Sequence, residues 1–294
     1  MIAEIEKTYP IGNDKVKWIS PEWLEQRLDA DDIQIVDVQP NVHDYMTEHI
    51  PGAVYMNENL MRLPDKGIPA RYVSREVMQE HMRRLGFTDD KALVVYSGKG
   101  VFKGWGDGLE QTFMAYNFAR FGHCNVMVLD GGLDRWKKEN RPLTQEFPKV
   151  EESKFETNVQ KDFFLTYEAF KNIKDSEEVI LLDARPPKAY REQSAWGKPG
   201  HIPGAINAPW PYFFTKENPF LLKSDEDIQH LIKKYGITHD KTIICSCGTG
   251  REATAEFILF KWYLEYPKVK IYEGSFTEWS AYPENPTVTG PNPR

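Results

Sequence analysis

The chain has 294 residues, of which 40% are hydrophobic and 13% aromatic, enough for one large or two ordinary domains with buried cores. Its net charge of −7, without a basic cluster, argues against a nucleic-acid-binding protein. No apolar run approaches the ~18 residues of a membrane span, and the N-terminus lacks the basic-then-apolar pattern of a signal peptide. We therefore expect an acidic, soluble protein of the cytoplasm, or of the periplasm if a signal peptide has been removed.

The chain has three cysteines, Cys124, Cys245 and Cys247. This number is odd and too small for a disulfide framework, so it suits a reducing compartment or a working thiol. Only Cys245 and Cys247 lie close together in the sequence, and their C-x-C spacing alone is not that of a zinc site. We expect no bound metal.

Four landmarks occur twice, in the same order, in the two halves of the chain. The pairs are IQIVDVQP (33–40) with VILLDARP (179–186), HIPGAV (49–54) with HIPGAI (201–206), DKALVVYSGKG (90–100) with DKTIICSCGTG (240–250), and VLDGGLDRW (128–136) with IYEGSFTEW (271–279). Because chance would not preserve the order, we predict two copies of one domain, at residues 1–145 and 146–294. The charged, proline-bearing stretch 137–159 is predicted to be a linker that crosses over the first domain.

In the second copy, strands and helices are predicted to alternate. Buried strands are expected at 177–184, 204–209, 241–246 and 269–274. A helix is predicted at 224–236, where a Ser-x-x-Asp cap opens the segment and a glycine closes it. A second helix follows the glycines at 248 and 250, with one apolar face made by Ala255, Ile258, Leu259 and Trp262. This alternation predicts an α/β fold with a parallel, doubly wound sheet in each copy, flanked by helices.

The turn after the strand 241–246 is the expected site, because ligands bind beyond the carboxyl ends of parallel strands. Gly248 and Gly250 allow the backbone N–H groups to point inward, and the following helix adds its positive end. A thiolate held in this way has a lowered pKa and is a good nucleophile. From Cys245, the string C-S-C-G-T-G-R matches the C-x-x-G-x-x-R loop of cysteine phosphatases; from Cys247, C-G-T-G-R-E resembles the active loop of rhodanese-type sulfurtransferases.

The internal repeat favours the second alignment. Cys245 corresponds to Val95, inside a predicted strand, whereas Cys247 corresponds to Ser97, the last residue before the glycines. Alternation along the strand places Cys245 on the same face as Ile243, where a cysteine acts as a small hydrophobe. We therefore predict that Cys247 is the nucleophile and that Cys245 belongs to the core.

These landmarks, from about Trp18 to Trp279, resemble those of the tandem-domain rhodanese family of thiosulfate and 3-mercaptopyruvate sulfurtransferases. The segments D-A-R…H-I-P-G-A-I-N and E-G-S-F-x-E-W flank the Cys247 loop as the family's signatures do. The resemblance implies an active site in the C-terminal domain. It also implies a catalytically inactive N-terminal domain, with Ser97 at the nucleophile position, that helps to wall the cleft.

The implied reaction is the transfer of a sulfane sulfur through a persulfide on Cys247. A small anionic donor, thiosulfate, 3-mercaptopyruvate or a polysulfide, supplies the sulfur, and cyanide, a thiol or a thioredoxin-like protein accepts it. Neither a cofactor nor an oligomeric partner is expected, and the chain is predicted to be a monomer. The persulfide charge would be held by the backbone N–H groups of the loop, formed by Gly248, Thr249, Gly250, Arg251 and Glu252.

Other candidate residues are Arg185, Arg251, Asp183 and the two histidines of the H-I-P-G-A turns. Arg185 matches a donor-anchoring arginine of the family, and its forked guanidinium suits a sulfonate or carboxylate. Arg251 is a second candidate for the donor, or a partner of a neighbouring glutamate. Asp183 is expected to be structural and to accept loop N–H groups. His201 and His49 are expected to hold their turns, although His49 could face the cleft as a first-domain histidine does in mercaptopyruvate-specific relatives.

The loop does not settle the donor. Gly248, Thr249 and Gly250 resemble the mercaptopyruvate-type loop, whereas the basic Arg251 favours thiosulfate and Glu252 opposes any dianion. On balance we expect thiosulfate, with mercaptopyruvate close behind. Two other functions stay open: a phosphatase or arsenate-reductase-like enzyme that uses Cys245 and Arg251, and a non-catalytic persulfide carrier.

Overall fold

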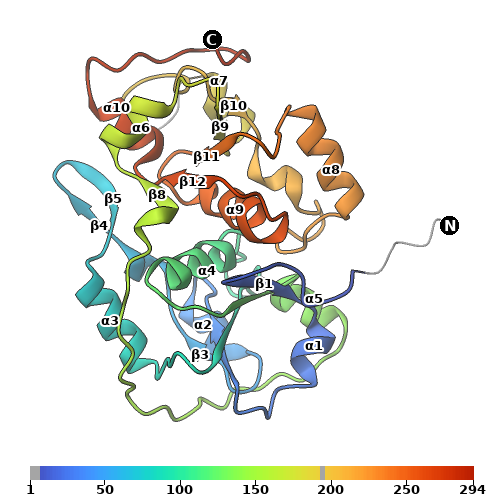
Figure 1. Cartoon of the computed structure of the whole chain (residues 1–294). Helices are drawn as coiled ribbons and strands as arrows, with labels where there is room; N and C mark the ends of the chain where they lie inside the picture. The colour runs from blue at the N-terminus through green and yellow to red at the C-terminus, as the bar shows by residue number, and fades with distance from the viewer. Residues whose placement is uncertain (1–6, 193–195) are drawn as a thin grey trace. The chain divides into compact units, whose positions relative to one another are not determined.

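The computed structural model describes residues 7–192 and 196–294, which form two compact units (Figure 1). The first unit holds the described residues of Met1–Met61, Val73–Gln160 and Phe214–Leu222, and the second holds those of Arg62–Tyr72, Lys161–Phe213 and Lys223–Arg294. Each unit thus contains a short segment from the other half of the sequence. The domain limits at 1–145 and 146–294 stay predictions.

The first unit contains a five-stranded parallel sheet in the order β1-β7-β6-β2-β3. Its strands are β1 (Val16–Ile19), β2 (Ile33–Asp37), β3 (Val54–Tyr55), β6 (Ala92–Tyr96) and β7 (Val126–Leu129). The central strand β6 is buried along its whole length, as its uninterrupted apolar sequence requires. Ser97 follows this strand directly and is buried as well.

Helices and extended chain cover this first sheet. The helices are α1 (Pro21–Glu25), α2 (Val42–Thr47), η1 (Glu58–Met61), α3 (Arg75–Arg84), α4 (Glu110–Arg120) and α5 (Gly132–Lys138). After α5 the chain runs without helix or strand to Gln160 and is tied to the unit by backbone hydrogen bonds. Thr144 pairs with His49, Ser153 donates to the carbonyl of Arg83, and Asn158 donates to that of Phe121.

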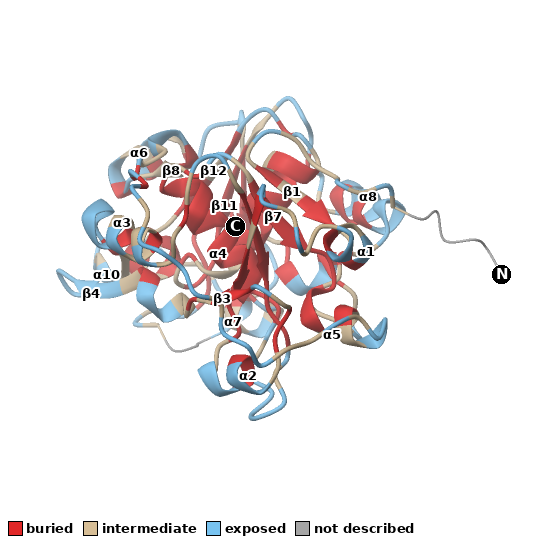
Figure 2. Ribbon diagram, turned by 90° about the horizontal axis from the view of Figure 1, so that it is seen from below, coloured by how far each residue is buried: buried red, intermediate tan, exposed pale blue. Residues whose placement is uncertain are grey.

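The second unit repeats the sheet strand for strand, in the order β10-β9-β11-β12-β8. Its strands are β8 (Phe164–Leu165), β9 (Val179–Asp183), β10 (Ile206–Asn207), β11 (Thr242–Ser246) and β12 (Val269–Tyr272). Figure 2 shows β11 among the buried segments. In the sheet, β11 lies between β9 and β12. The parallel strands and alternating helices confirm the predicted α/β architecture of both copies.

The helices of the second unit include the two that the sequence predicts. They are η2 (Lys161–Phe163), α6 (Tyr167–Ile173), α7 (Pro187–Arg191), η3 (Trp210–Phe213), α8 (Asp225–Lys234), α9 (Glu252–Ile258) with the π-helical turn η4 (Leu259–Tyr263), and α10 (Ser275–Ala281). The Ser224 side chain caps α8 by accepting from the N–H of Asp227. The predicted apolar face of α9 and η4 is buried. Within the described residues, the search for a helix of sufficient length and hydropathy to span a membrane finds none.

An antiparallel hairpin from the first half of the sequence completes the second unit. Its strands, β4 (Arg62–Asp65) and β5 (Ile68–Tyr72), pair Arg62 with Tyr72 and Leu63 with Arg71. From this hairpin the Arg71 guanidinium reaches the Glu278 carboxylate of α10 at 2.6 Å. No local sequence pattern predicts this association, because it joins segments that are far apart in the chain.

Candidate functional site

Cys247 lies immediately after the central strand β11 of the second unit. The strand is paired on both sides, with β9 and β12, so its carboxyl end opens onto the edge of the sheet where ligands of α/β proteins bind. The Cys247 side chain is fully buried. The structure therefore places the predicted nucleophile at the expected edge of the sheet, inside the protein.

The loop after Cys247 turns its backbone toward the sulfur. The Gly250 N–H donates to Cys247 Sγ at 3.1 Å. Gly250 has φ +81°, and a Cβ at this position would lie 2.4 Å from the Glu273 carbonyl oxygen. Only glycine satisfies both the backbone angle and the close approach. The loop geometry thus depends on Gly250.

Helix α10 holds the other side of the same loop. The Cys247 N–H donates to Ser275 Oγ at 3.1 Å, while the carbonyl oxygens of Cys247 and Gly248 accept from the N–H groups of Phe276 and Thr277. Ser275 is buried and has φ +51°, an uncommon angle for a residue with a side chain. Sequence reasoning did not single out Ser275 or Thr277. The internal repeat contained a signal for Ser275, because the equivalent residue of the first copy is a glycine, Gly132. In the structure Gly132 has a similar backbone angle, φ +56°.

Two further side chains contact the loop from outside. Arg62, on the hairpin, donates from Nη1 to the Thr249 carbonyl at 2.7 Å and to Thr249 Oγ1 at 3.3 Å. Trp196 covers Gly248 so closely that a Cβ at residue 248 would lie 2.1 Å from the indole, whose Nε1 donates to Thr277 Oγ1 at 2.7 Å. The sequence analysis missed both residues, because neither belongs to a motif near Cys247.

The acid–base environment of Cys247 differs from the sequence prediction. Burial, and then the negative charge of Glu252, raise the pKa of Cys247 well above its usual value. Asp183 acts in the same direction, and the Ala253 N–H opposes it. The expected lowering of the pKa is therefore wrong for this structure, because burial of the thiol, followed by the charge of Glu252, raises the pKa more than the N–H groups of the loop lower it.

Arg185 is committed to Asp183 in a fully buried ion pair. Its Nε lies 2.9 Å from Asp183 Oδ1 and its Nη2 2.6 Å from Oδ2, and it also donates to the carbonyls of Ala189 and Gly200. The guanidinium carbon lies over the Phe276 ring, 4.3 Å from the ring centroid. The backbone N–H of Arg185 donates to Asp183 too, at 3.0 Å. The structure thus shows Asp183 as an acceptor of N–H groups, and the donor-anchoring role of Arg185 stays a prediction.

The remaining predicted residues are placed as follows. Arg251 is the N-cap residue of α9, and its carbonyl accepts from Thr254. His49 belongs to the first unit, with its ring nitrogens 2.7 Å and 3.1 Å from the carbonyls of Tyr45 and Glu146. His201, in the equivalent turn of the second unit, has the same kind of contacts, with the carbonyls of Tyr190 and Asn292. Both histidines thus connect separate backbone segments around their turns.

Cys245 lies within β11, and its side chain is fully buried. Burial, and then the nearby Glu256, raise the pKa of its thiol well above the usual value. Its backbone is in register with Leu182 of β9 and Ile271 of β12. A residue enclosed by strands on both sides has no loop around it to bind a phosphate, so the phosphatase alternative gains no geometric support.

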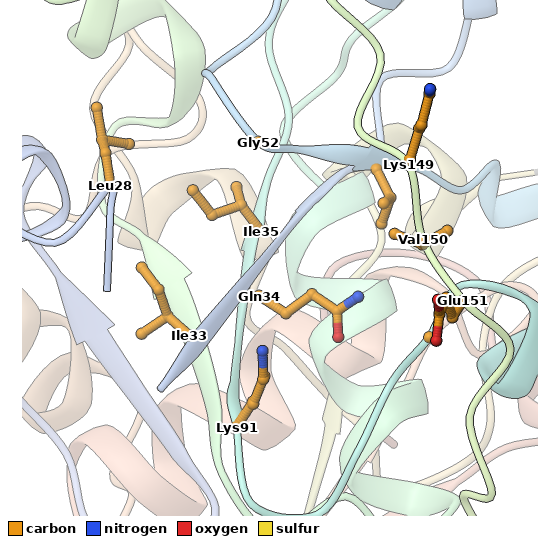
Figure 3. A pocket seen from close by; sticks show the side chains of 11 residues that line it. Leu28, Ile33, Gln34, Ile35, Gly52, Lys91, Lys149, Val150 and Glu151 are labelled. Atoms are coloured by element: carbon orange, nitrogen blue, oxygen red, sulfur yellow. The ribbon is translucent and has the colours of Figure 1, made fainter. Parts of the chain in front are cut away.

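A pocket of about 450 Å³ adjoins the Cys247 loop in the second unit. Its walls come from the hairpin, the loop and α10, and its lining residues are Pro69, Trp196, Gly197, Thr249, Thr277, Ser280 and Ala281. The first unit has a pocket of its own, of about 290 Å³, at the amino ends of β2 and β6 (Figure 3). Of these two pockets in the described part of the chain, the one in the second unit borders the loop predicted from the sequence.

Comparison with known proteins identifies the family of the domains. The model of the rhodanese-like domain matches twice, at residues 20–139 and 166–282. A relative from Synechococcus elongatus is named as a thiosulfate sulfurtransferase. It is 34% identical over 289 residues, which cover 94% of this chain and 86% of that protein. The sulfur carrier protein TtuD of Thermus thermophilus is 30% identical over 275 residues, covering 89% and 92%.

A solved structure is similar over nearly its whole length. The crystal structure of the 3-mercaptopyruvate sulfotransferase SseA from Escherichia coli matches with a TM-score of 0.77 and 26% identity. The match covers 88% of this chain and 98% of SseA. The tandem architecture predicted from the internal repeat is thereby confirmed.

Proposed function

Because the chain belongs to the rhodanese family, with two rhodanese-like domains, we propose that it is a sulfurtransferase that carries sulfane sulfur as a persulfide on Cys247. The contact that carries this proposal is the 3.1 Å approach of the Gly250 N–H to Cys247 Sγ. A backbone donor aimed at the sulfur stabilises negative charge on it without a side-chain acid. The negative charge of a persulfide formed on Cys247 would stay within reach of the Gly250 N–H.

The reaction is a double displacement. The sulfur of Cys247 attacks the outer sulfur of the donor, the bond between that sulfur and the rest of the donor breaks, and a thiophilic acceptor later removes the sulfur from the persulfide. We propose thiosulfate or 3-mercaptopyruvate as the donor, and cyanide, a thiol or a thioredoxin-like protein as the acceptor. The names of the relatives support the two donors, and the pocket beside Thr249 is large enough for either.

The other residues of the loop contribute mainly through their backbone in this proposal. Gly248 and Thr249 present carbonyl oxygens to Thr277 and Arg62, so these carbonyls point away from the sulfur. Arg251 stays a candidate for contact with the donor. Arg185 could bind the sulfur donor only through N–H groups that its ion pair with Asp183 leaves available. Its proposed role is therefore the least supported. A cytoplasmic location and a monomeric state are part of the same proposal.

A sulfur carrier is the second candidate function. The name of the Thermus thermophilus relative and the complete burial of Cys247 favour it, since a buried thiol suits the storage and directed hand-over of sulfur. Persulfide formation is common to both candidates. They differ in whether small donors and acceptors sustain turnover.

One experiment separates these functions. The protein is incubated with thiosulfate or 3-mercaptopyruvate plus cyanide, thiocyanate is followed, and Cys247→Ser is compared with Cys245→Ser. Loss of turnover in Cys247→Ser alone supports the sulfurtransferase. Sulfur gain on Cys247 without turnover supports the carrier. Loss in Cys245→Ser alone, or hydrolysis of an aryl phosphate instead, contradicts both.

A further inference from the structure

Contacts from outside the Cys247 loop decide which way its peptide groups face. The Thr249 carbonyl oxygen accepts from Arg62 Nη1 at 2.7 Å. The N–H of the same peptide group, which belongs to Gly250, donates to Cys247 Sγ at 3.1 Å. Because the C=O and N–H of a trans peptide point in opposite directions, a donor that holds the carbonyl turns the N–H to the other side. An outer contact thus aims an inner donor at the sulfur.

The preceding peptide group, between Gly248 and Thr249, is held by Thr277 of α10. The Gly248 carbonyl oxygen accepts from the Thr277 N–H at 2.9 Å and from Thr277 Oγ1 at 2.7 Å. Trp196 Nε1 in turn donates to Thr277 Oγ1 at 2.7 Å. Since an indole nitrogen is only a donor, the threonine hydroxyl accepts from Trp196 and gives its own hydrogen to the Gly248 carbonyl. The relay fixes the direction of this peptide group.

The Thr249 N–H belongs to the peptide group that Thr277 holds. By the same trans geometry it faces away from the side on which the Gly248 carbonyl is held. It lies one residue before the Gly250 N–H that contacts the sulfur. Within the described residues the Thr249 N–H has no hydrogen-bond acceptor, so it is available to a negatively charged atom added at Cys247.

The first copy of the domain turns the equivalent peptide group the other way. The repeat places Lys99 at the position of Thr249, and Asp134 at that of Thr277. A carboxylate is only an acceptor, and Asp134 Oδ2 accepts from the Lys99 N–H at 2.8 Å. The backbone N–H that Thr277 leaves free in the second copy is therefore consumed by α5 in the first.

The peptide group before this one has the same contact in both copies. The Ser97 carbonyl accepts from the Leu133 N–H at 2.8 Å, and the Cys247 carbonyl accepts from the Phe276 N–H at 3.0 Å. The helix thus contacts the strand end in the same way in the two units. The difference begins at the next helix residue, which offers a donor in the second copy and an acceptor in the first.

We propose that Thr277, supported by Trp196, is a positioning residue that aims the Thr249 N–H at the outer sulfur of a Cys247 persulfide, an inference that rests on the proposed sulfurtransferase function. The outer sulfur lies about 2 Å beyond Sγ and carries the negative charge of the persulfide anion. The Gly250 N–H is within reach of Sγ, and the Thr249 N–H adds a donor for the transferred atom. Thr277 acts through the peptide group and not by contact with the sulfur.

The test compares two substitutions at residue 277. Thr277→Val keeps the shape of threonine but leaves the backbone N–H as the single donor from this residue to the Gly248 carbonyl, whereas Thr277→Ser keeps the hydroxyl. Thr112→Val is the matched control, because it removes a buried threonine hydroxyl of the first unit that donates to the Leu109 carbonyl at 3.0 Å.

The first measurement is the equilibrium of the persulfide. The protein is loaded with sulfur from thiosulfate or 3-mercaptopyruvate and then equilibrated in mixtures of thiosulfate and sulfite. The fraction of persulfide is read from the mass of the peptide that contains Cys247, because Cys124 is exposed and reacts as well. This equilibrium reports the stabilisation of the added sulfur directly.

The second measurement is the amide resonance of Thr249 in protein labelled with a nitrogen isotope at threonine. Thr249→Ser identifies the resonance by its loss. Spectra with and without the persulfide show whether the Thr249 N–H meets the added sulfur, which a merely structural role of Thr277 would not require.

We expect the equilibrium in Thr277→Val to shift toward the sulfur-free protein by about 10-fold, because a hydrogen bond to a charged atom is weakened. Thr277→Ser and Thr112→Val stay close to wild type. The Thr249 resonance moves on persulfide formation in wild type and in Thr277→Ser, and moves much less in Thr277→Val.

Three results overturn the inference. They are a wild-type equilibrium in Thr277→Val, an equal loss in Thr277→Ser and Thr277→Val, and a Thr249 resonance of the wild type that does not respond to the persulfide. A wild-type protein that gains no sulfur from either donor contradicts the proposed function itself, and the inference falls with it.

Discussion

Arg62 donates a hydrogen bond of 2.7 Å to the carbonyl oxygen of Thr249, although 187 residues separate the two in the sequence. Through this contact a hairpin encoded in the first half of the chain fixes the third residue of the Cys247 loop. The hairpin also contacts α10 through Arg71 and Glu278. The second unit therefore depends on residues 62–72 for the shape of its predicted site.

Replacing Arg62 by alanine is expected to lower kcat/KM for sulfur transfer by about 10- to 100-fold, because a small misplacement of reacting groups has effects of this size. Steady-state thiocyanate formation measures it. Arg75→Ala is the control, since the Arg75 side chain is exposed and forms its ion pair with the neighbouring Glu76. Equal activity of Arg62→Ala and wild type would show that the loop keeps its shape without the hairpin contact.

Arg185 is expected to act on stability more than on donor binding. Arg185→Gln leaves the buried Asp183 carboxylate without its cation, which costs about 3–5 kcal/mol when one partner of a buried pair is removed. In the first copy an uncharged glutamine, Gln39, occupies the position equivalent to Arg185. Its Nε2 donates to Asp37 at 2.9 Å, and burial raises the pKa of Asp37 to about 6. Urea unfolding at neutral pH measures the change. Full stability with a raised KM for thiosulfate would instead support the donor-anchoring role.

Ser275 combines a hydroxyl that accepts from Cys247 with a backbone angle that suits glycine. Ser275→Gly and Ser275→Ala lose the same hydrogen bonds, to the Cys247 N–H and the Tyr272 carbonyl. They should therefore lose sulfur-transfer activity to the same extent. Alanine keeps the positive φ of +51°, so Ser275→Ala should be less stable than Ser275→Gly by about 1 kcal/mol. Thermal unfolding of the two variants checks this order, and equal stability would argue against strain at this position.

Glu256 is expected to make folding less favourable as the pH rises. Its pKa is raised in the folded protein above the usual value of 4.5, so between these values the folded state binds more protons than the unfolded one. The contribution of protonated Glu256 to the free energy of unfolding is fully present below about pH 4.5. It is lost as the pH rises through the pKa that Glu256 has in the folded protein.

Replacing Glu256 by methionine removes this titration. The gain in the free energy of unfolding over wild type should grow with pH above about 4.5 and stay constant below it. Urea unfolding of both proteins across this range measures the difference. A difference that does not vary with pH would show that Glu256 has no raised pKa in the folded state.

The sequence predicted the sheet well because local patterns specify it. Apolar runs such as 241–246 form strands wherever they are buried on both faces, and Ser224 caps its helix through a contact only three residues away. The repeat also located Cys247 at the strand end, since Ser97 occupies the equivalent position after β6. The pKa of Cys247 was predicted with the wrong sign, because the sequence does not show that the thiol is fully buried, and burial, followed by the charge of Glu252, raises the pKa.

By itself, the sequence determined that the chain holds two copies of one α/β domain and that only the second has a cysteine directly after its central strand. These properties follow from order, periodicity and residue identity along the chain. Only the tertiary structure decided which distant groups meet there: Arg62 on Thr249, Ser275 on the Cys247 N–H, and Arg185 turned to Asp183. Such pairings depend on how the elements pack in space, and packing also decides which charges lose their water and shift their pKa.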